Sequence, residues 1–373
     1  MTKFVILCMH CDYDFSIAFL LKRYGFDFVI FRLRQASGMI KDINELGRNK
    51  IVVGDRDDLL SLIKKGDIVI NGTNSLFYTL GLKRIFYYLF FKRNKIITWP
   101  TGSDISELSV EKTFHGFVYR FLLHRSILKV IPPYPYVLRN LKELNISNYF
   151  LLKYPYFLKK LKPVDEFRES KVIFFCPSNI DFCVTDNKKN RNSSKGTDRF
   201  LRAFLRAYQE NNSIKCIFLD RGQDKEIAKD FVRKNCSDAF EILEPMTRKE
   251  LEDYFHKVDC VVDQFDVGGF GMISMEALAQ GKPVMIYINK NCWPLVYDEE
   301  PPVINCQTED EIYHAILQWA DRKKLQGLGE RAEKWVRKYH DVHTADFSEF
   351  IFRVCLAAGL EWPRKDLAKE HKF

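Results

Sequence analysis

The residues best suited to chemistry lie between positions 260 and 284. An apolar run from Cys260 to Val262 predicts a buried strand, and three glycines follow it between residues 268 and 271. A helical pattern that carries Glu276 begins directly behind these glycines. Such glycines let the backbone approach a ligand closely, and the N-terminus of the following helix favours an anion such as a diphosphate. Glu276, about one turn into the helix, is placed to accept hydrogen bonds from sugar hydroxyls.

Glycine loops between a strand and a helix also serve packing alone in doubly wound domains. The full string favours ligand binding over that alternative. Gly268-Gly269-Phe270-Gly271-Met272, then Glu276 and the tail Gly281-Lys282-Pro283-Val284, resembles the donor-site signature of retaining GT-B glycosyltransferases of family 4. The usual form of that signature is Glu-Gly-Phe-Gly, four residues, then Glu-Ala-x-Ala-x-Gly-x-Pro-Val. The resemblance implies that Glu276 binds the ribose of a donor nucleotide.

Gly268 stands where the resembled family carries the first of its two glutamates, eight residues before the second. In that family the first acid is associated with the donor sugar, so this role has no matching residue in the chain. Asp263 and Asp266 lie in the same loop and are candidates to replace it. The Asp263-Gln264 pair is similar to a variant in a subset of such enzymes. Because this glutamate is missing, a second interpretation stays open, that of a GT-B protein that binds nucleotide without transferring sugar.

A second loop suited to phosphate follows the apolar run that ends at Cys176. Lys195-Gly196 closes a polar stretch and opens a helical pattern with an apolar face, Phe200 to Tyr208. In the resembled family a Lys-Gly pair at this place opens the first helix of the nucleotide domain, and its lysine meets the donor diphosphate. The resemblance therefore implies that Lys195 stabilises the departing diphosphate. Position 190, where the family has an arginine, is Asn, and Arg191 is a neighbouring cation.

The acceptor side is expected in the N-terminal half. A turn after the run Lys95 to Thr98 looks like the Gly-Ser/Thr-Asp turn that faces the cleft in many GT-B enzymes, and its residues are Gly102, Ser103 and Asp104. Asp104 could equally cap the next helix. His10, directly after the first apolar run, is a further cleft candidate.

Length and pattern predict two domains of an α/β class. A chain of 373 residues is long for one hydrophobic core. Short apolar runs alternate with helical stretches, break at a linker rich in proline and lysine near residue 160, and then resume. Thr247 with Glu250, and Thr308 with Glu311, have capping-box spacing. We therefore expect two Rossmann-like doubly wound domains facing across a cleft, with boundaries at residues 1–160 and 161–345, and a C-terminal helix within 346–373 that returns to the first domain.

Charge and cysteine content indicate the compartment and the class of partner. The net charge of +9 attracts anions in general, and the dispersed basic residues match no nucleic-acid motif. Ten scattered cysteines favour a reducing compartment, and neither a signal peptide nor a run of spanning length is legible, so we expect a cytoplasmic protein. Two segments mix aromatic and basic residues, Phe77 to Lys95 and Phe114 to Lys129. Such segments suit peripheral contact with an anionic membrane at its inner face, although buried helices have similar content.

The resemblance implies a glycosyltransferase of the hexosyltransferase type (EC 2.4). The enzyme would move a sugar from a nucleotide-diphosphate sugar to a glycan or lipid-linked acceptor, with retention, in the synthesis of cell-surface polysaccharide or glycoconjugate. It would need neither metal nor cofactor, because cationic side chains and backbone N–H groups neutralise the diphosphate. Replacement of Glu276 by alanine is expected to remove transfer and leave the fold intact. A nucleotide-sugar epimerase is a further alternative.

Overall fold

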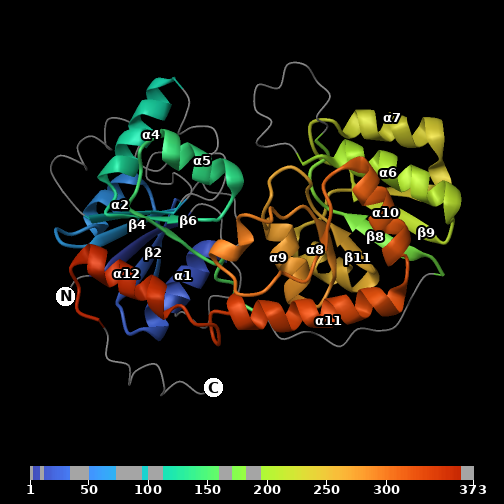
Figure 1. The fold of residues 1–373 in the computed structure, drawn as a ribbon. Helices are drawn as coiled ribbons and strands as arrows, with labels where there is room; N and C mark the ends of the chain where they lie inside the picture. Colours follow the sequence, from blue (N-terminus) through green and yellow to red (C-terminus); the bar gives the residue numbers. More distant parts are fainter. Residues whose placement is uncertain are drawn as a thin grey trace. The chain divides into compact units, whose positions relative to one another are not determined.

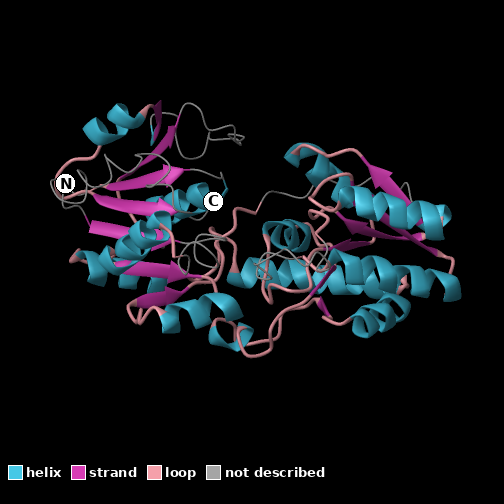
Figure 2. Cartoon of the chain, turned by 90° about the horizontal axis from the view of Figure 1, so that it is seen from above, coloured by secondary structure: helices cyan, strands magenta, loops and turns pink. Residues whose placement is uncertain are grey.

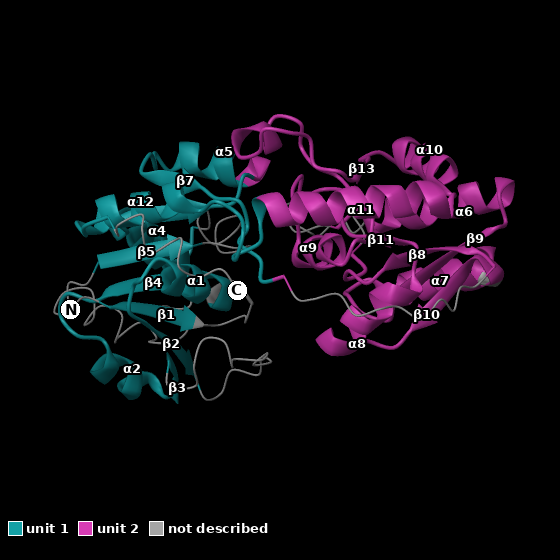
Figure 3. Cartoon of the chain, turned by 90° about the horizontal axis from the view of Figure 1, so that it is seen from below, with its two compact units in different colours: residues 1–133, 137–157, 339–373 teal, residues 134–136, 158–338 magenta. Residues whose placement is uncertain are grey.

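The computed structural model describes residues 3–8, 12–33, 50–72, 95–99, 112–158, 170–181 and 195–362. Strands and helices alternate along these residues, and the strands form two separate parallel sheets (Figure 1). The chain divides into two compact units (Figure 3). The first comprises Met1–Pro133, Val137–Phe157 and Tyr339–Phe373, and the second comprises Tyr134–Tyr136 and Leu158–Lys338.

The first unit contains a parallel sheet with the strand order β3-β2-β1-β4-β5-β6-β7. Its strands are β1 (Phe4–Cys8), β2 (Phe28–Leu33), β3 (Ile51–Gly54), β4 (Ile68–Gly72), β5 (Lys95–Trp99), β6 (Leu128–Ile131) and β7 (Tyr149–Leu151). Its helices are α1 (Asp12–Arg23), α2 (Arg56–Leu62), α4 (Phe114–Arg125), α5 (Pro135–Glu143, of which the first two residues cluster with the second unit) and α12 (Ser348–Ala358).

Both faces of this sheet are covered by helices (Figure 2), which explains why its strands are mostly apolar. Successive side chains of a strand point to opposite faces. Phe4 and Ile6 of β1 pack with α1 and α12, whereas Val5 and Leu7 pack with α2 and α4. The sheet is therefore the middle layer of three.

The strands β6 and β7 were not expected from the sequence. Lys129 lies within β6 and is fully buried, with its Nζ donating to the Ser126 carbonyl oxygen at 2.9 Å and to Asn148 Oδ1. This lysine interrupts the apolar pattern by which a short strand is recognised. The edge strand β7 has only three residues, and none of them is fully buried.

The second unit contains a parallel sheet with the strand order β10-β9-β8-β11-β12-β13. Its strands are β8 (Val172–Cys176), β9 (Ile214–Leu219), β10 (Phe240–Leu243), β11 (Cys260–Val262), β12 (Val284–Ile286) and β13 (Ile304–Asn305). Its α-helices are α6 (Thr197–Glu210), α7 (Lys225–Asn235), α8 (Arg248–Tyr254), α9 (Met272–Ala279), α10 (Glu309–Trp319) and α11 (Arg322–Tyr339). This order is the doubly wound Rossmann order, so the predicted α/β class and Rossmann-like form are confirmed for both units.

The helix starts predicted from capping-box spacing are confirmed. Thr247 caps α8 and Thr308 caps α10, and in each helix the glutamate three residues later bonds back to the cap residue. The cap of α8 places Arg248 at the first position of that helix.

The chain re-enters the first unit through a short parallel bridge between Tyr156 and Asp341. Arg23 of α1 fixes this returning segment by donating to the carbonyl oxygens of Val342 and Ala345, at 2.9 and 3.0 Å. The helix α12 then buries Phe350, Ile351 and Val354 in the same core as β1. Across the described residues, no helix is long and apolar enough to span a bilayer.

Candidate functional site

The strand order places two loops together in the second unit. β8 and β11 are neighbours, and the chain winds away from them in opposite directions, so the ends of these strands form the switch point at which doubly wound sheets bind ligands. Lys195 stands at the end of the connection after β8, and the segment 263–271 follows β11. The backbone N–H of Phe265 donates to the Lys195 carbonyl oxygen at 2.9 Å, which ties the two loops directly.

Glu276 lies in the second turn of α9 and is 2% exposed. Its Oε1 accepts a hydrogen bond from the guanidinium of Arg248, at the start of α8. A buried carboxylate needs such a partner, because desolvation would otherwise favour its neutral form. The pair therefore fixes the orientation of the Glu276 carboxylate. Arg248 was not singled out from the sequence, although the capping box at Thr247 placed it at a helix start.

Asp263, a candidate substitute acid, is buried and joins two elements at the switch point. Its Oδ1 accepts from the Ser178 hydroxyl at 2.7 Å, and its Oδ2 accepts from the Ser274 hydroxyl. Ser178 belongs to the loop after β8, and Ser274 lies in the first turn of α9. The carboxylate therefore holds that loop against the helix.

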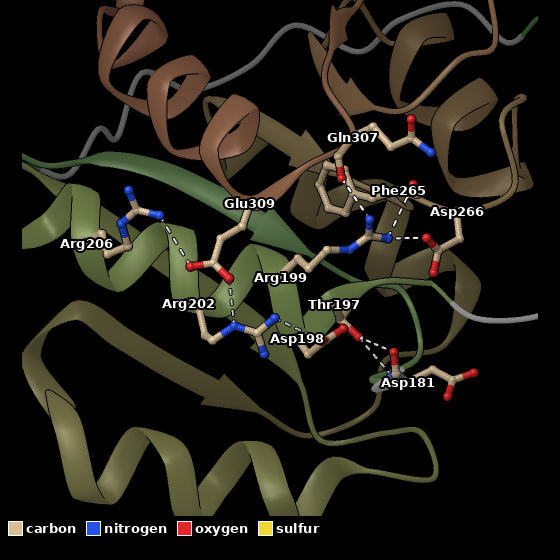
Figure 4. Close-up of polar contacts among 10 residues, drawn as sticks. All are labelled: Asp181, Thr197, Asp198, Arg199, Arg202, Arg206, Phe265, Asp266, Gln307 and Glu309. Carbon is tan, nitrogen blue, oxygen red and sulfur yellow. Dashed lines mark hydrogen bonds and ion pairs between the residues drawn. The ribbon is translucent and has the colours of Figure 1, made fainter. Parts of the chain in front are cut away.

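Asp266, the second candidate acid, is paired with Arg199 of the first turn of α6 (Figure 4). The same guanidinium donates to the Gln307 carbonyl oxygen at 3.0 Å and to the Phe265 carbonyl oxygen at 3.4 Å. Arg199 thus fastens the loop after β11 to α6 and to the start of α10. Both candidate acids are engaged in holding the loops of the site.

Packing accounts for the three glycines that the sequence suggested for close approach of a ligand. Gly268 has φ of +77°, and a Cβ there would lie 3.1 Å from Pro135. A Cβ on Gly269 would lie 2.2 Å from the ring of Tyr134, and one on Gly271 would lie 2.7 Å from an oxygen of Asp263. A glutamate at position 268 would therefore be strained, which explains in local terms why the first acid of the signature is replaced by glycine.

Tyr134 is a second residue that the sequence did not indicate. Its ring lies over Gly269, and its hydroxyl donates to the carbonyl oxygen of Phe270. Burial and the nearby charge of Asp263 raise the pKa of this tyrosine, so it remains a hydrogen-bond donor at physiological pH. The Phe270 ring itself packs against Tyr297 and Trp335, at centroid distances of 6.5 and 5.5 Å. Phe270 therefore anchors the loop, and Met272 begins α9 directly behind it.

Lys195 is half-buried, and its position is fixed by the turn around it. The Thr197 hydroxyl accepts from the backbone N–H of Asp181 at 2.8 Å and donates to the carbonyl oxygen of the same residue (Figure 4). Gly196 precedes α6 with φ of +65°. Burial and Asp263 raise the pKa of the Cys176 thiol to about 12, and the charges of Lys195 and Arg221 oppose this rise. Both cations therefore act on the end of β8.

Several predicted site residues lie outside the described residues: Arg191, His10, Gly102, Ser103 and Asp104. Their roles stay predictions. Of the donor-side residues, Lys195 and Gly268 to Glu276 gather at one switch point. No group of three His, Cys, Asp or Glu side chains in the described part of the chain is arranged to hold a metal ion.

Comparison with known proteins gives a match to one family and many solved structures with the same fold. Residues 188–335 match the family described as glycosyl transferases group 1. No curated protein sequence matches the chain. HepE of Anabaena, solved with UDP and glucose, is 12% identical with a TM-score of 0.66, over 95% of this chain and 100% of its own.

Two further solved structures share the fold. Sucrose-phosphate synthase of Thermosynechococcus elongatus is 14% identical with a TM-score of 0.61, over 96% of this chain and 100% of its own. TarM of S. aureus, solved with UDP and alpha-GlcNAc-glycerol, is 13% identical with a TM-score of 0.58. That match covers 81% of this chain and 58% of TarM, so the chain spans little more than half of that protein. At these identities the likeness concerns the fold.

Proposed function

From the match of residues 188–335 to the glycosyl transferases group 1 family and from the GT-B fold of the chain, we propose that the protein transfers a sugar from a nucleotide-diphosphate sugar to a glycan or lipid-linked acceptor. The proposal rests on the buried, ion-paired Glu276 after β11 and on Lys195 in the loop after the neighbouring strand β8. A carboxylate held in this way suits ribose hydroxyls, and a lysine across the strand ends suits a diphosphate.

The proposed reaction breaks the bond between C1 of the sugar and a β-phosphate oxygen, and the electron pair stays on the diphosphate. An acceptor hydroxyl oxygen forms the new bond to C1 and loses its proton to the departing diphosphate. Lys195 and the N-terminus of α9 stabilise the negative charge that develops. Glu276 holds the nucleotide in place, and this orients the bond between C1 and the β-phosphate oxygen toward the acceptor hydroxyl. This division of roles assigns no step to a resident cofactor.

Finer aspects of the proposal follow the resemblance of the donor signature to family 4. We propose a hexosyltransferase that retains the configuration at C1 and acts in cell-surface polysaccharide or glycoconjugate synthesis. HepE and TarM were both solved with UDP, so UDP-sugars are the first donors to test.

A thermal-shift series with UDP-, GDP-, ADP- and TDP-sugars tests donor binding. A ligand that binds only the folded chain, at a hundred times its Kd, adds about 2.7 kcal/mol to the free energy of unfolding. We expect one nucleotide to raise the melting temperature and its sugar conjugate to be hydrolysed slowly without acceptor. Absence of any shift across the series would contradict the proposal.

A second candidate function is nucleotide binding without transfer. Gly268 cannot carry the missing acid without backbone strain, and Asp263 and Asp266 are both committed to hydrogen bonds or ion pairs. The same series separates the two candidates. A nucleotide-binding partner would be stabilised by the nucleotide but release no sugar, whereas an epimerase would convert the donor to a second nucleotide sugar without acceptor.

We also propose that the first unit contacts an anionic membrane through α4. Phe114, Phe117 and Phe121 recur at helical spacing and are 57, 54 and 39% exposed. The exposed Lys112 lies two residues before this helix, and the exposed Arg125 is its last residue. An apolar stripe beside cations suits a surface of acidic lipids. The second segment proposed for this role, Phe77 to Lys95, lies almost wholly outside the described residues. Flotation with lipid vesicles tests the proposal.

A further inference from the structure

The turn that follows β9 places an arginine beside the donor-side cluster. The Arg221 backbone N–H donates to the Leu219 carbonyl oxygen at 2.7 Å, and its carbonyl oxygen accepts from Ile180 N–H at 2.9 Å. Gly222 follows with φ of +113°, and a Cβ there would lie 2.3 Å from the Ile180 carbonyl oxygen. The backbone of Arg221 is therefore held tightly against the loop after β8.

The side chain of Arg221 has the features of a cation without a counter-ion. Its Nε is buried and lacks a hydrogen-bond partner, and within the described part of the chain no carboxylate lies within ion-pair distance of its guanidinium. Burial lowers the pKa of this guanidinium, and the charges of Asp263 and Glu276 oppose the shift. Arg221 thus lies next to the loop after β8, and its buried Nε carries a desolvation cost that no hydrogen bond from the described residues offsets.

The carboxylates near Arg221 already have other partners. Asp263 accepts from Ser178 and Ser274, and Glu276 accepts from Arg248. The backbone of Arg221 bonds to Ile180 in the loop after β8, and Lys195, at the end of the same connection, bonds to Phe265 after β11. Two cations from different loops therefore converge on the end of β8, and the anion that would balance them is not part of the described chain.

We propose that Arg221 binds the diphosphate of the donor nucleotide together with Lys195. This inference rests on the proposed function and deepens it. A guanidinium presents a planar fork of donors that matches two phosphate oxygens, whereas lysine acts as a point charge. When the bond between C1 and the β-phosphate oxygen breaks, the electron pair stays on the diphosphate. Arg221 donates two hydrogen bonds to the phosphate group on which this charge develops.

The test uses Arg221→Gln and Arg221→Lys in the full chain, with Arg233→Gln as the matched control. Arg233 lies on α7 in the same unit, is exposed and pairs only with Asp230 among the described residues. Binding of UDP, GDP, ADP and TDP, and of the corresponding nucleoside monophosphates, is measured by calorimetry. Arg221→Gln is expected to weaken diphosphate binding roughly 10- to 100-fold and monophosphate binding by less than about threefold. Arg221→Lys should fall between, and Arg233→Gln should match the parent chain.

Thermal unfolding without ligand separates this role from a structural one. Arg221→Gln should leave the melting temperature unchanged or raise it, because it removes a desolvated charge that lacks a partner. A fall in melting temperature together with unchanged diphosphate affinity would overturn the inference and leave the proposed function standing. Absence of nucleoside diphosphate binding by the parent chain would overturn both. If Arg221→Gln does not fold, undiminished diphosphate affinity of Arg221→Lys overturns the inference, and a loss of about tenfold supports it.

Discussion

Glu276 and Arg248 show how a single side chain can serve both fold and proposed site. The carboxylate is buried, and Arg248 supplies the charge that makes its burial tolerable. A ribose would meet a group whose orientation is already fixed. The structure therefore revises the expectation that Glu276→Ala leaves the fold intact, because that change strands a largely buried guanidinium.

Replacement of Glu276 should affect stability and transfer to different degrees. Glu276→Ala breaks a buried ion pair, and we expect it to lower the free energy of unfolding by about 3–5 kcal/mol. Glu276→Gln keeps an acceptor for Arg248 and should cost about 1 kcal/mol, while still weakening the bonds to the ribose. Denaturant unfolding and nucleotide binding check both variants. Parent-like nucleotide affinity of Glu276→Gln would contradict the ribose role.

The sequence indicated Glu276 and Lys195 but not the side chains that contact them. Each lies after a predicted strand, so their placement at the same edge of the sheet could be expected. The sequence could not predict the positions of Arg248, Arg221 and Tyr134, because these depend on how loops far apart in the chain pack together. Each follows a strand end or a helix start, and that was the only local signal.

The positions of strands and helices were largely predictable, whereas the contacts of the glycine loop were not. The apolar runs at Val172–Cys176, Phe240–Leu243 and Cys260–Val262 became strands with these bounds. The glycine loop follows β11 as expected, but its glycines make room for Tyr134, Pro135 and Asp263. A run of glycines in the sequence indicates that the backbone is closely approached by another group. It does not show whether that group is a ligand or a side chain of the protein itself.

The returning segment after α11 carries a histidine that should make the first unit sensitive to acid. His340 is fully buried, and its Nδ1 donates to the Tyr154 carbonyl oxygen at 2.6 Å. Burial lowers its pKa to about 3, against this hydrogen bond and with a smaller contribution from Lys153. In the unfolded chain the His340 imidazole has a pKa near 6.5. It therefore binds a proton at pH values at which the same imidazole in the folded chain stays neutral. This stabilisation is complete above about pH 6.5 and falls by about 1.4 kcal/mol per pH unit down to about 3.

His340→Asn keeps a donor for Tyr154 and removes the titration. Its free energy of unfolding should decline less steeply than that of the parent chain between pH 6.5 and 4.5. The exposed His314→Asn serves as the control and should follow the parent. Equal slopes for all three chains would show that His340 does not set the acid limit. Urea unfolding at stepped pH provides the measurement.

The net charge of +9 and the exposed aromatic stripe of α4 should both favour binding to an acidic membrane. We expect the chain to float with vesicles that contain acidic lipid and to remain unbound with neutral ones. Replacement of Phe114, Phe117 and Phe121 by serine should abolish flotation, because the apolar contact is lost. Replacement of the exposed Ile227 and Leu295 of the second unit by serine is the matched control. Binding of the stripe variant as strong as that of the parent would contradict the proposal.

The return of the chain to its first unit has a consequence for biosynthesis. The second unit is almost continuous, since apart from residues 134–136 it consists of Leu158–Lys338. The first core instead needs Phe347, Phe350 and Ile351, which leave the ribosome long after β1. Until they emerge, the face of the first sheet that α12 covers stays exposed, and such a surface binds chaperones or aggregates. The unit that is synthesised first is therefore the last to be completed.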